Sequence, residues 1–215
     1  MKITEPSLPI AAELCSDATA LAAACRSSGD DISGIKLSSD GSCDLSGLEF
    51  FRMIFENCHL SKSDFSRSAF ADVLFSGCDL SNCDFSDCYF SRCRFSDCRL
   101  TGAQFTGSTL KNVSLLGCGM QYAVLNRAKL SSVSAEGCDF SRVSLSESSQ
   151  QDFSPKSCNF SSANFFKTSL RGIDFSLCSI DGISVSSELS ELRGATVSRW
   201  QASELIRLAG VKISE

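Results

Sequence analysis

The sequence is poor in the residues and motifs that most enzymes need. Its 215 residues include a single histidine, His59. It contains no phosphate-binding glycine loop, no zinc-protease helix motif and no serine-nucleophile elbow. Acid–base and metal-dependent active sites bring several such groups together in one cleft. We therefore expect no enzymatic activity, no catalytic residue, no bound metal and no cofactor.

A basic excess and long apolar runs are also missing. The chain has 20 Lys and Arg against 25 Asp and Glu, whereas binding of a phosphate backbone requires a basic stripe. Direct nucleic-acid binding is therefore not expected. The first residues lack the positive start and apolar run of a signal peptide. The Ala-rich stretch at 10–25 contains Glu13 and Asp17, so it is not a membrane span.

What the sequence does contain is a strict period of five. The 29 positions from Leu45 to Val185, taken every fifth residue, include 26 large apolar residues, and only Ala135, Gln150 and Pro155 depart from this. A period of five matches neither a helix nor an alternating strand. It requires a backbone that turns a corner every five residues and returns each fifth side chain to the interior. The pattern predicts one elongated all-β solenoid domain.

A second position supports the first. Two residues before each large apolar residue stands a small or medium one, as in Cys-Asp-Leu-Ser-Asn-Cys-Asp-Phe-Ser-Asp at 78–87. Inward side chains two residues apart suit a short extended segment, and the remaining polar residues suit a turn. A cysteine also recurs every 20 residues, which indicates coils of four units with one thiol column on one side. This column comprises Cys58, Cys78, Cys98, Cys118, Cys138, Cys158 and Cys178.

These units resemble the pentapeptide-repeat family, whose consensus is A(N/D)LXX. The resemblance implies a right-handed quadrilateral β-helix of about seven coils, roughly 35 Å long at the usual strand spacing. We expect an N-terminal cap with a short helix at 1–40 and the β-helix at 41–187. A final partial coil and a C-terminal helix would occupy 188–215.

The 13 cysteines allow three interpretations. Stacked neighbours on adjacent coils have parallel Cβ vectors at strand spacing, which suits a disulfide poorly. A metal site would need Cys83, Cys88, Cys93 and Cys98 to converge from four sides without a His or Asp. Buried free Cys acts as a small apolar residue, so we favour core packing. Reduced thiols also favour a cytoplasmic location.

Both ends depart from the repeat. A short helix is expected within 10–25, with Pro9 in its first turn, and Ile32, Ile35 and Leu37 would form an off-register first turn of the coil. At the other end Ser198 suits the N-cap of a helix over 199–209, which Gly210 would stop. The tail from Trp200 to Ile213 resembles the ending of the Qnr quinolone-resistance proteins. That resemblance implies an end-to-end homodimer, with an interface at Trp200, Leu205, Ile206 and Leu208.

One internal segment, 146–157, is irregular. Gln150 and Pro155 occupy inward sites and Phe153 stands where a small residue belongs. Pro cannot donate a ladder hydrogen bond. We expect a local bulge here, with Phe153 inserted in place of a large residue; the alternatives are a harmless irregularity and a binding protrusion.

The surface carries the functional hypotheses. Asp44, Asp64 and Asp84 should form one acidic column. Qnr proteins and the related MfpA imitate DNA and bind type II topoisomerases, so the first hypothesis is a DNA mimic that modulates quinolone susceptibility. Two features depart from that pattern: residues 40–187 hold 16 acidic against 13 basic residues, and no loop interrupts 43–148. The alternative is a general protein-interaction scaffold, for which the candidate apolar contacts are Ile54, Leu74 and Phe51, together with Tyr89, Leu116, Tyr122 and Phe166.

Overall fold

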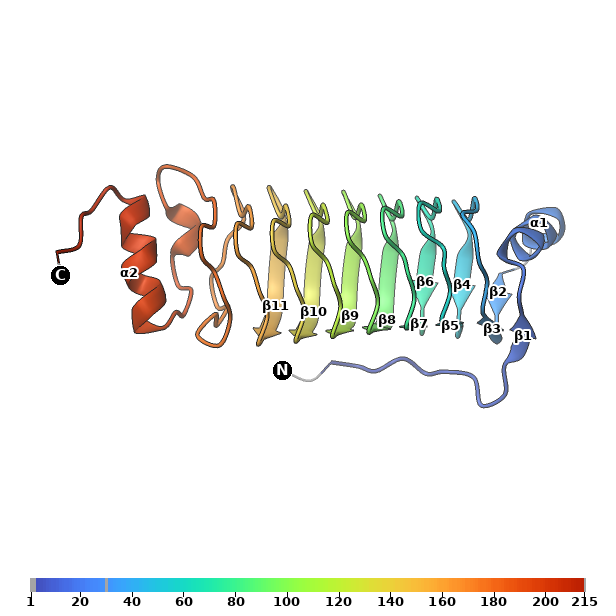
Figure 1. Ribbon diagram of the computed structural model, residues 1–215. Helices are drawn as coiled ribbons and strands as arrows, with labels where there is room; N and C mark the ends of the chain where they lie inside the picture. Colours follow the sequence, from blue (N-terminus) through green and yellow to red (C-terminus); the bar gives the residue numbers. More distant parts are fainter. Residues whose placement is uncertain (1–2, 30, 215) are drawn as a thin grey trace.

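The computed structural model describes residues 3–29 and 31–214, which form a straight rod (Figure 1). The rod is a parallel β-solenoid of about seven turns. Partners on successive turns lie 20 residues apart, as in the pairs Phe50–Phe70 and Asp64–Asp84. One inward residue every five positions therefore gives each turn four sides, as the sequence predicts.

Two adjacent sides carry strands. The early turns have β4 (Glu49–Phe51) with β5 (Ile54–Glu56), and β6 (Ala69–Ala71) with β7 (Leu74–Ser76). In later turns the two strands merge into one, namely β8 (Tyr89–Ser96), β9 (Thr109–Leu116), β10 (Lys129–Glu136) and β11 (Ser149–Lys156). The other two sides are joined by isolated bridges such as His59–Asp79. We call these pairs of sides the strand sides and the bridge sides.

The corners explain the polar residues of each unit. Of the 20 non-glycine residues with positive φ in the described chain, all but Leu189 stand two positions after an inward site. Asn and Asp tolerate this left-handed backbone, and Gly adopts it without a steric cost. The residue before the inward site is often Asp or Asn because its side chain caps the turn. The Oδ1 atom of Asp79, for example, accepts the backbone N–H of Ser81 at 3.0 Å.

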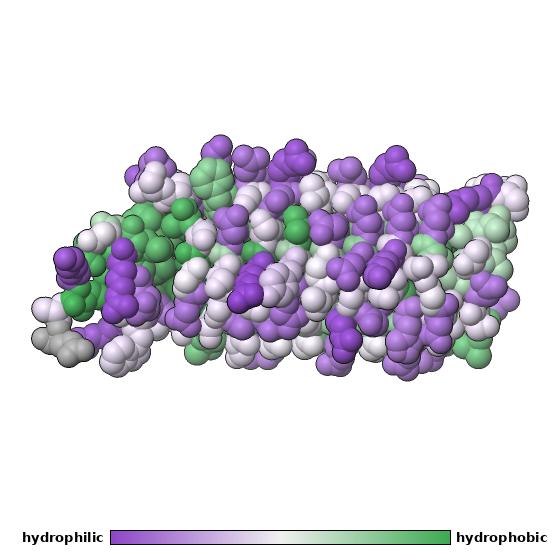
Figure 2. All heavy atoms as spheres, turned by 45° about the horizontal axis from the view of Figure 1, so that its top comes forward, coloured by the Kyte–Doolittle hydropathy of each residue, from purple (hydrophilic) through white to green (hydrophobic). Residues whose placement is uncertain are grey.

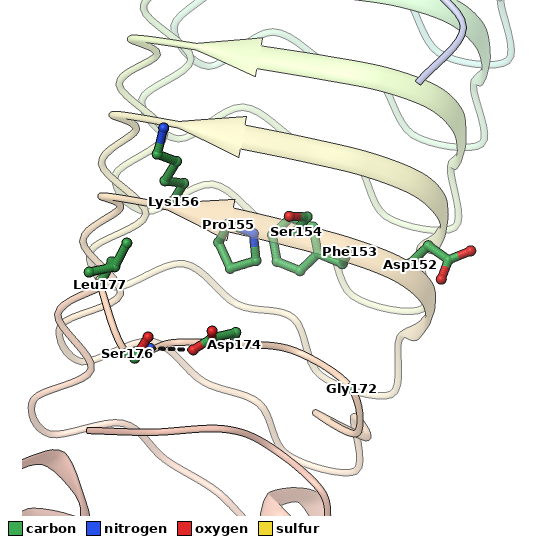
Figure 3. A pocket seen from close by; sticks show the side chains of 9 residues that line it. All are labelled: Asp152, Phe153, Ser154, Pro155, Lys156, Gly172, Asp174, Ser176 and Leu177. Carbon is green, nitrogen blue, oxygen red and sulfur yellow. Dashed lines mark hydrogen bonds between the residues drawn. The ribbon is translucent and has the colours of Figure 1, made fainter. Parts of the chain in front are cut away.

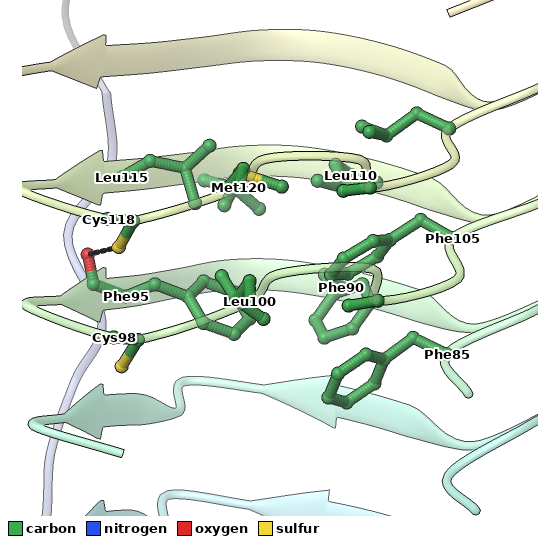
Figure 4. Packing of buried hydrophobic residues seen from close by; sticks show 14 of the residues in the cluster. Phe85, Phe90, Phe95, Cys98, Leu100, Phe105, Leu110, Leu115, Cys118 and Met120 are labelled. Atoms are coloured by element: carbon green, nitrogen blue, oxygen red, sulfur yellow. Dashed lines mark hydrogen bonds between the residues drawn. The ribbon is translucent and has the colours of Figure 1, made fainter. Parts of the chain in front are cut away.

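The core is a set of stacked columns. Every inward position from Leu45 to Ile180 is buried except Gln150. Phe70 and Phe90 stack with ring centroids 4.7 Å apart, and Phe75 and Phe95 with centroids 4.5 Å apart, close to the spacing of parallel strands. Beyond Phe105 the same columns continue as Leu110, Leu115 and Met120 (Figure 4).

The predicted N-terminal helix is misplaced. The structure has β1 (Glu13–Cys15), then α1 (Ala18–Ser28), and the residues before β1 run back along the rod (Figure 1). The helix starts late because Asp17 accepts the backbone N–H of Ala20 at 2.9 Å and acts as its N-cap. β1 pairs with β3 (Ile35–Leu37), while β2 (Ile32–Ser33) pairs with β4. The solenoid therefore begins within the segment that the sequence assigned to the cap.

No bulge forms at 146–157. β11 pairs with β10 in unbroken register, and Phe153 lies opposite Val133 and packs edge-on against Phe140 and Phe160. The insertion of Phe153 into the core is thus confirmed, but the bulge prediction is wrong. The irregularity lies on the other edge of β11, which has no strand partner within the described chain.

Side chains close the C-terminal end. Glu191, in the short 3-10 helix η1 (Ser190–Leu192), is buried. Its carboxylate accepts the backbone N–H groups of Lys167 and Ser186 at 2.8 and 3.1 Å and the Ser186 hydroxyl at 2.8 Å. Burial would raise the pKa of Glu191, but these hydrogen bonds outweigh it and the pKa is lowered.

The C-terminal helix follows the prediction closely. α2 spans Arg199–Leu208, with Ser198 as N-cap in a capping box with Gln201. The Gln201 side-chain amide donates to the carbonyl groups of Phe175 and Cys178 at 2.8 and 2.6 Å, which docks the helix on the end of the rod.

Candidate interaction surfaces

The lone histidine lies on the outside. His59 Nδ1 is 2.8 Å from Asp40 Oδ1, and both side chains are largely exposed. Within residues 3–29 and 31–214, no group of three His, Cys, Asp or Glu side chains is arranged to hold a metal ion. No helix in the same part of the chain is long and apolar enough to cross a membrane.

The seven thiols of the predicted column are all buried and free. All but Cys178 lie within hydrogen-bond distance of backbone carbonyls in the described chain; Cys78 Sγ, for instance, lies 3.4 Å from the carbonyl oxygens of both Phe55 and Ser76. Beside the column, burial raises the pKa of the Cys83, Cys88 and Cys93 thiols to about 12. Such thiols stay protonated, which suits packing and not nucleophilic attack.

The predicted acidic column exists but is short. Asp44, Asp64 and Asp84 are parallel bridge partners on one bridge side. The Oδ1 atoms of Asp64 and Asp84 each accept a turn N–H at 2.8 Å, which fixes their carboxylates on the surface. Hydrogen bonds from Ser46 and from Arg26 lower the pKa of Asp44. The column then continues as uncharged Gln104, Val124 and Ser144.

Elsewhere opposite charges alternate along the rod. Five ion pairs join an acidic residue to a basic residue one turn away, where opposite charges attract. These pairs are Lys36–Glu56, Arg92–Asp72, Arg99–Asp79, Lys156–Glu136 and Lys167–Glu147. The surface is therefore mixed in charge, and even in the acidic column Asp44 is paired with Arg26 at 3.0 Å, so Asp64 and Asp84 are its members without an ion pair in the described chain.

The predicted apolar surface is only partly free. Ile54 and Leu74 pair across adjacent turns and are half-buried, while Phe51 is 43% exposed. The N-terminal arm crosses this region, because Glu5 pairs with Arg94 at 2.7 Å and the Ser7 N–H donates to Asp72 at 2.9 Å.

The other predicted apolar residues are scattered. Tyr89, Tyr122 and Phe166 are exposed and stand on different sides, whereas Leu116 is half-buried. Tyr122 and Phe166 each carry a neighbouring cation over the ring, from Arg142 and Lys167 respectively. They do not form one patch.

The largest concentration of exposed apolar side chains lies at the C-terminal end (Figure 2). α2 has no buried residue, and Trp200 is 83% exposed. Ile206 and Leu208 are also exposed, whereas Leu205 packs partly buried against the core. Leu205 therefore does not belong to the free face to which the sequence assigned it. Val211 and Ile213, which follow α2 in the chain, are also exposed.

Comparison with known proteins agrees with the repeat. The family model for the pentapeptide repeat region matches residues 48–125. No curated protein matches the chain significantly.

Among solved structures, one form of trypsin-treated QnrB1, a plasmid-mediated fluoroquinolone resistance protein, aligns over 85% of this chain and 92% of its own at 21% identity and a TM-score of 0.47. A second trypsin-treated form aligns over 98% and 99% at 22% identity and a TM-score of 0.41. HetL, a pentapeptide-repeat protein involved in heterocyst differentiation regulation in a Nostoc cyanobacterium, aligns over 81% and 92% at 17% identity and a TM-score of 0.35. Identities and TM-scores this low carry no argument about function, so we look for it in the surface of this chain.

Proposed function

This chain contains a pentapeptide-repeat region, and from that premise we propose that it is a non-enzymatic protein-binding rod that acts as an end-to-end homodimer. The observation that carries the proposal is the exposed apolar face of α2. A contiguous apolar patch on a soluble domain marks a protein interface. Within the described residues the core is filled, and the protonated thiols of Cys83, Cys88 and Cys93 suit packing better than chemistry. Thirteen cysteines in one chain suit a reducing compartment, and we propose a cytoplasmic location.

A second copy is the occupant that best suits α2. The helix sits on the end of the rod, where a two-fold axis would join two solenoids without blocking their sides (Figure 1). An interface built from one helix in each copy is self-complementary, as a two-fold dimer requires. Trp200 and Ile206 would lie at its centre, because large apolar and aromatic residues dominate such contacts.

Analytical ultracentrifugation tests the dimer. The unsubstituted protein should sediment as a dimer at micromolar concentration, and Trp200→Glu with Ile206→Glu should sediment as a folded monomer. Tyr122→Glu, which changes an exposed aromatic far from α2, is the matched control and should remain dimeric. A monomeric unsubstituted protein would contradict the proposal, as would a dimer that persists in the double variant.

A type II topoisomerase is a second candidate partner, favoured by the rigid acidic column. Asp64 and Asp84 hold their carboxylates in fixed positions on adjacent turns, as a mimic of a phosphate row needs. The column has one charge per turn of about 4.8 Å, against one per 3.4 Å along a DNA strand. It is therefore sparser than DNA, and the general protein-binding role fits the surface better.

Gyrase-catalysed supercoiling, with and without ciprofloxacin, separates the two candidates. Inhibition or drug protection at micromolar protein would support the topoisomerase. Asp64→Asn with Asp84→Asn should then abolish the effect, since Asn keeps the turn hydrogen bond but loses the charge. Asp97→Asn is the control on another side. No effect on gyrase or topoisomerase IV would rule out this partner and leave the general scaffold.

A further inference from the structure

The hydrogen-bond ladder of the strand sides stops after β11. One turn earlier the Gly137 N–H donates to the Lys156 carbonyl at 3.0 Å, but no backbone hydrogen bond within the described chain joins 149–157 to 169–177. The bridge sides stay joined at the same level, through Asn159–Ser179 and Asn164–Ser184. Two sides of the solenoid are thus open while the other two remain closed.

The cause is a change in how the corners close. In residues 169–178 the Ile173 N–H donates to the Leu170 carbonyl at 3.1 Å, and the Cys178 N–H to the Phe175 carbonyl at 2.8 Å. Bonds of this kind close most corners of the bridge sides, as in Ser63 N–H to the Leu60 carbonyl, but no such bond is found at the strand-side corners of the preceding turns in the described chain. The tightened corners draw the segment away from β11. At one end the Gln150 side chain spans the gap, with Nε2 2.9 Å from the Arg171 carbonyl oxygen and 3.2 Å from that of Ser169.

The opening is a groove of about 380 Å³ between β11 and the following segment (Figure 3). This volume lies within the usual range for ligand sites, about 300–1,000 Å³. Leu177, 69% exposed, stands at one end of the groove and also borders a second hollow of about 430 Å³. The groove is lined by Asp152, Phe153, Ser154, Pro155, Lys156, Gly172, Asp174, Ser176 and Leu177.

We propose that this groove binds an extended peptide segment that pairs as an added strand with the free edge of β11. The edge presents backbone groups that pair in every earlier turn, among them the N–H groups of Asp152 and Ser157 and the carbonyl of Phe153. Arg52, Asp72 and Gly77 show the earlier pattern, each donating its N–H to the next turn at 2.9–3.0 Å. An extended backbone supplies donors and acceptors at the matching spacing.

Charge selects the side chains of the peptide. Asp152 lies toward the Gly172 end of the groove, and Asp174 on the facing segment (Figure 3). Neither acid has an ion-pair partner within the described chain, whereas Lys156 is already paired with Glu136 at 3.1 Å. We expect a basic side chain beside Asp152 and Asp174. A small apolar side chain would lie over Phe153, Pro155 and Leu177.

The groove is separate from α2 and from the acidic column, so its test is independent of the proposed function. The probe is a random heptapeptide library displayed on phage and selected on the full-length protein. Selection against the Asp152→Lys variant removes peptides that bind elsewhere. Lysine fits this left-handed position, because Lys62 and Lys167 occupy equivalent corners. A selected heptapeptide is then synthesised with a fluorescent label and titrated by anisotropy.

Three results are expected. Asp152→Lys and Leu177→Ser should each weaken binding about tenfold or more, and Asp87→Lys, at an equivalent corner on another side, should not. Methylating alternate backbone nitrogens of the peptide should abolish binding, because a strand pairs through its N–H groups. Bound peptide should slow amide exchange at Asp152 and Ser157. The proposal is overturned if no peptide survives counter-selection, or if the N-methylated peptide binds equally well.

Discussion

The turns at 49–156 and the turn at 165–184 follow the same five-residue pattern but are held together differently. In the first region strands pair in register from β4 to β11 and phenylalanine rings stack along the axis. In the second the inward residues are equally buried, yet the strand sides carry no ladder to β11. The inward residues thus determine what enters the core, while the corner determines whether adjacent turns bond to one another.

Where the ladder ends, side chains make the hydrogen bonds to the backbone. Gln150 spans the gap after β11, Glu191 accepts the N–H groups of Lys167 and Ser186, and Gln201 holds α2 on the end of the rod. Each replaces several repeated backbone bonds with a few specific ones. The regular region should therefore lose stability mainly through core packing, and the C-terminal region through single polar groups.

The largest effect should come from truncating a stacked ring. Phe70→Ala should cost about 3–5 kcal/mol of unfolding free energy, because it leaves a cavity in a column that cannot collapse. Its ring lies against those of Phe50, Phe65, Phe75, Phe85 and Phe90. Phe165→Ala is the matched change, since Phe165 is equally buried but meets only the rings of Phe160 and Phe175. Urea unfolding should show a smaller loss of unfolding free energy for Phe165→Ala than for Phe70→Ala. Equal losses would contradict the idea that the two regions differ in packing.

A single polar group should matter most in the C-terminal region. Glu191→Gln should cost about 1–3 kcal/mol, because the amide cannot accept all three hydrogen bonds and leaves buried donors unpaired. Glu188→Gln changes an exposed acid three residues away and should alter stability by less than about 0.5 kcal/mol. Thermal unfolding compares the two variants. A neutral Glu191→Gln would show that this carboxylate does not hold the end of the rod.

The same carboxylate makes stability depend on pH. The folded pKa of Glu191 is lowered, so its contribution is present above the unfolded value of about 4.3 and is lost as pH falls through the folded pKa. The stability difference between the unsubstituted protein and Glu191→Gln should therefore be largest near pH 7 and shrink below about pH 4. Asp72, whose pKa is lowered by Arg92, acts in both proteins and cancels in the comparison. A difference that does not change with pH would contradict this assignment.

The smallest effect should come from the exposed ion pairs. Lys156→Ala removes the partner of Glu136, but both side chains are more than half exposed, so the loss should be below about 1 kcal/mol. Arg92→Ala should cost more, because it leaves the carboxylate of Asp72 buried without its bidentate partner. Chemical denaturation of the two variants tests the order. The reverse order would mean that burial does not govern these pairs.

The sequence predicts the solenoid well because one physical rule repeats in every turn. Each inward position can be identified by counting, and Phe153 could be placed in the core although it breaks the pattern. The start of α1 was predicted too early, although Asp17, the N-cap that sets it, is a local signal in the sequence. The opening after β11 was also missed: Gly172 is one of many corner glycines, and nothing local shows that its corner closes tightly.

The surface was harder to predict than the core. The acidic column at Asp44, Asp64 and Asp84 could be predicted from the 20-residue spacing. The ion pair of Asp44 with Arg26 could not, because Arg26 lies in α1, outside the repeat. Leu205 was assigned to the free face of α2 because helix periodicity does not reveal which side meets the rod. Leu177 stands two positions after the inward Phe175, where most turns have a polar residue or glycine. This apolar residue at a corner was the one sign of the groove that the sequence offered.

Residue-resolved hydrogen exchange of the free protein tests most directly whether one five-residue pattern yields both a closed and an open stack of turns. The amides of Gly77 and Gly137, which donate across adjacent turns, should exchange slowly. The amide of Ser157, which matches these glycines, and that of Asp174, which matches Leu74 and Arg94, lie beside the groove and should exchange orders of magnitude faster. The amides of Asn159 and Asn164 on the bridge sides should stay protected. Equal protection of Ser157 and Gly137 would mean that the ladder continues past β11, and the contrast between the two regions would be wrong.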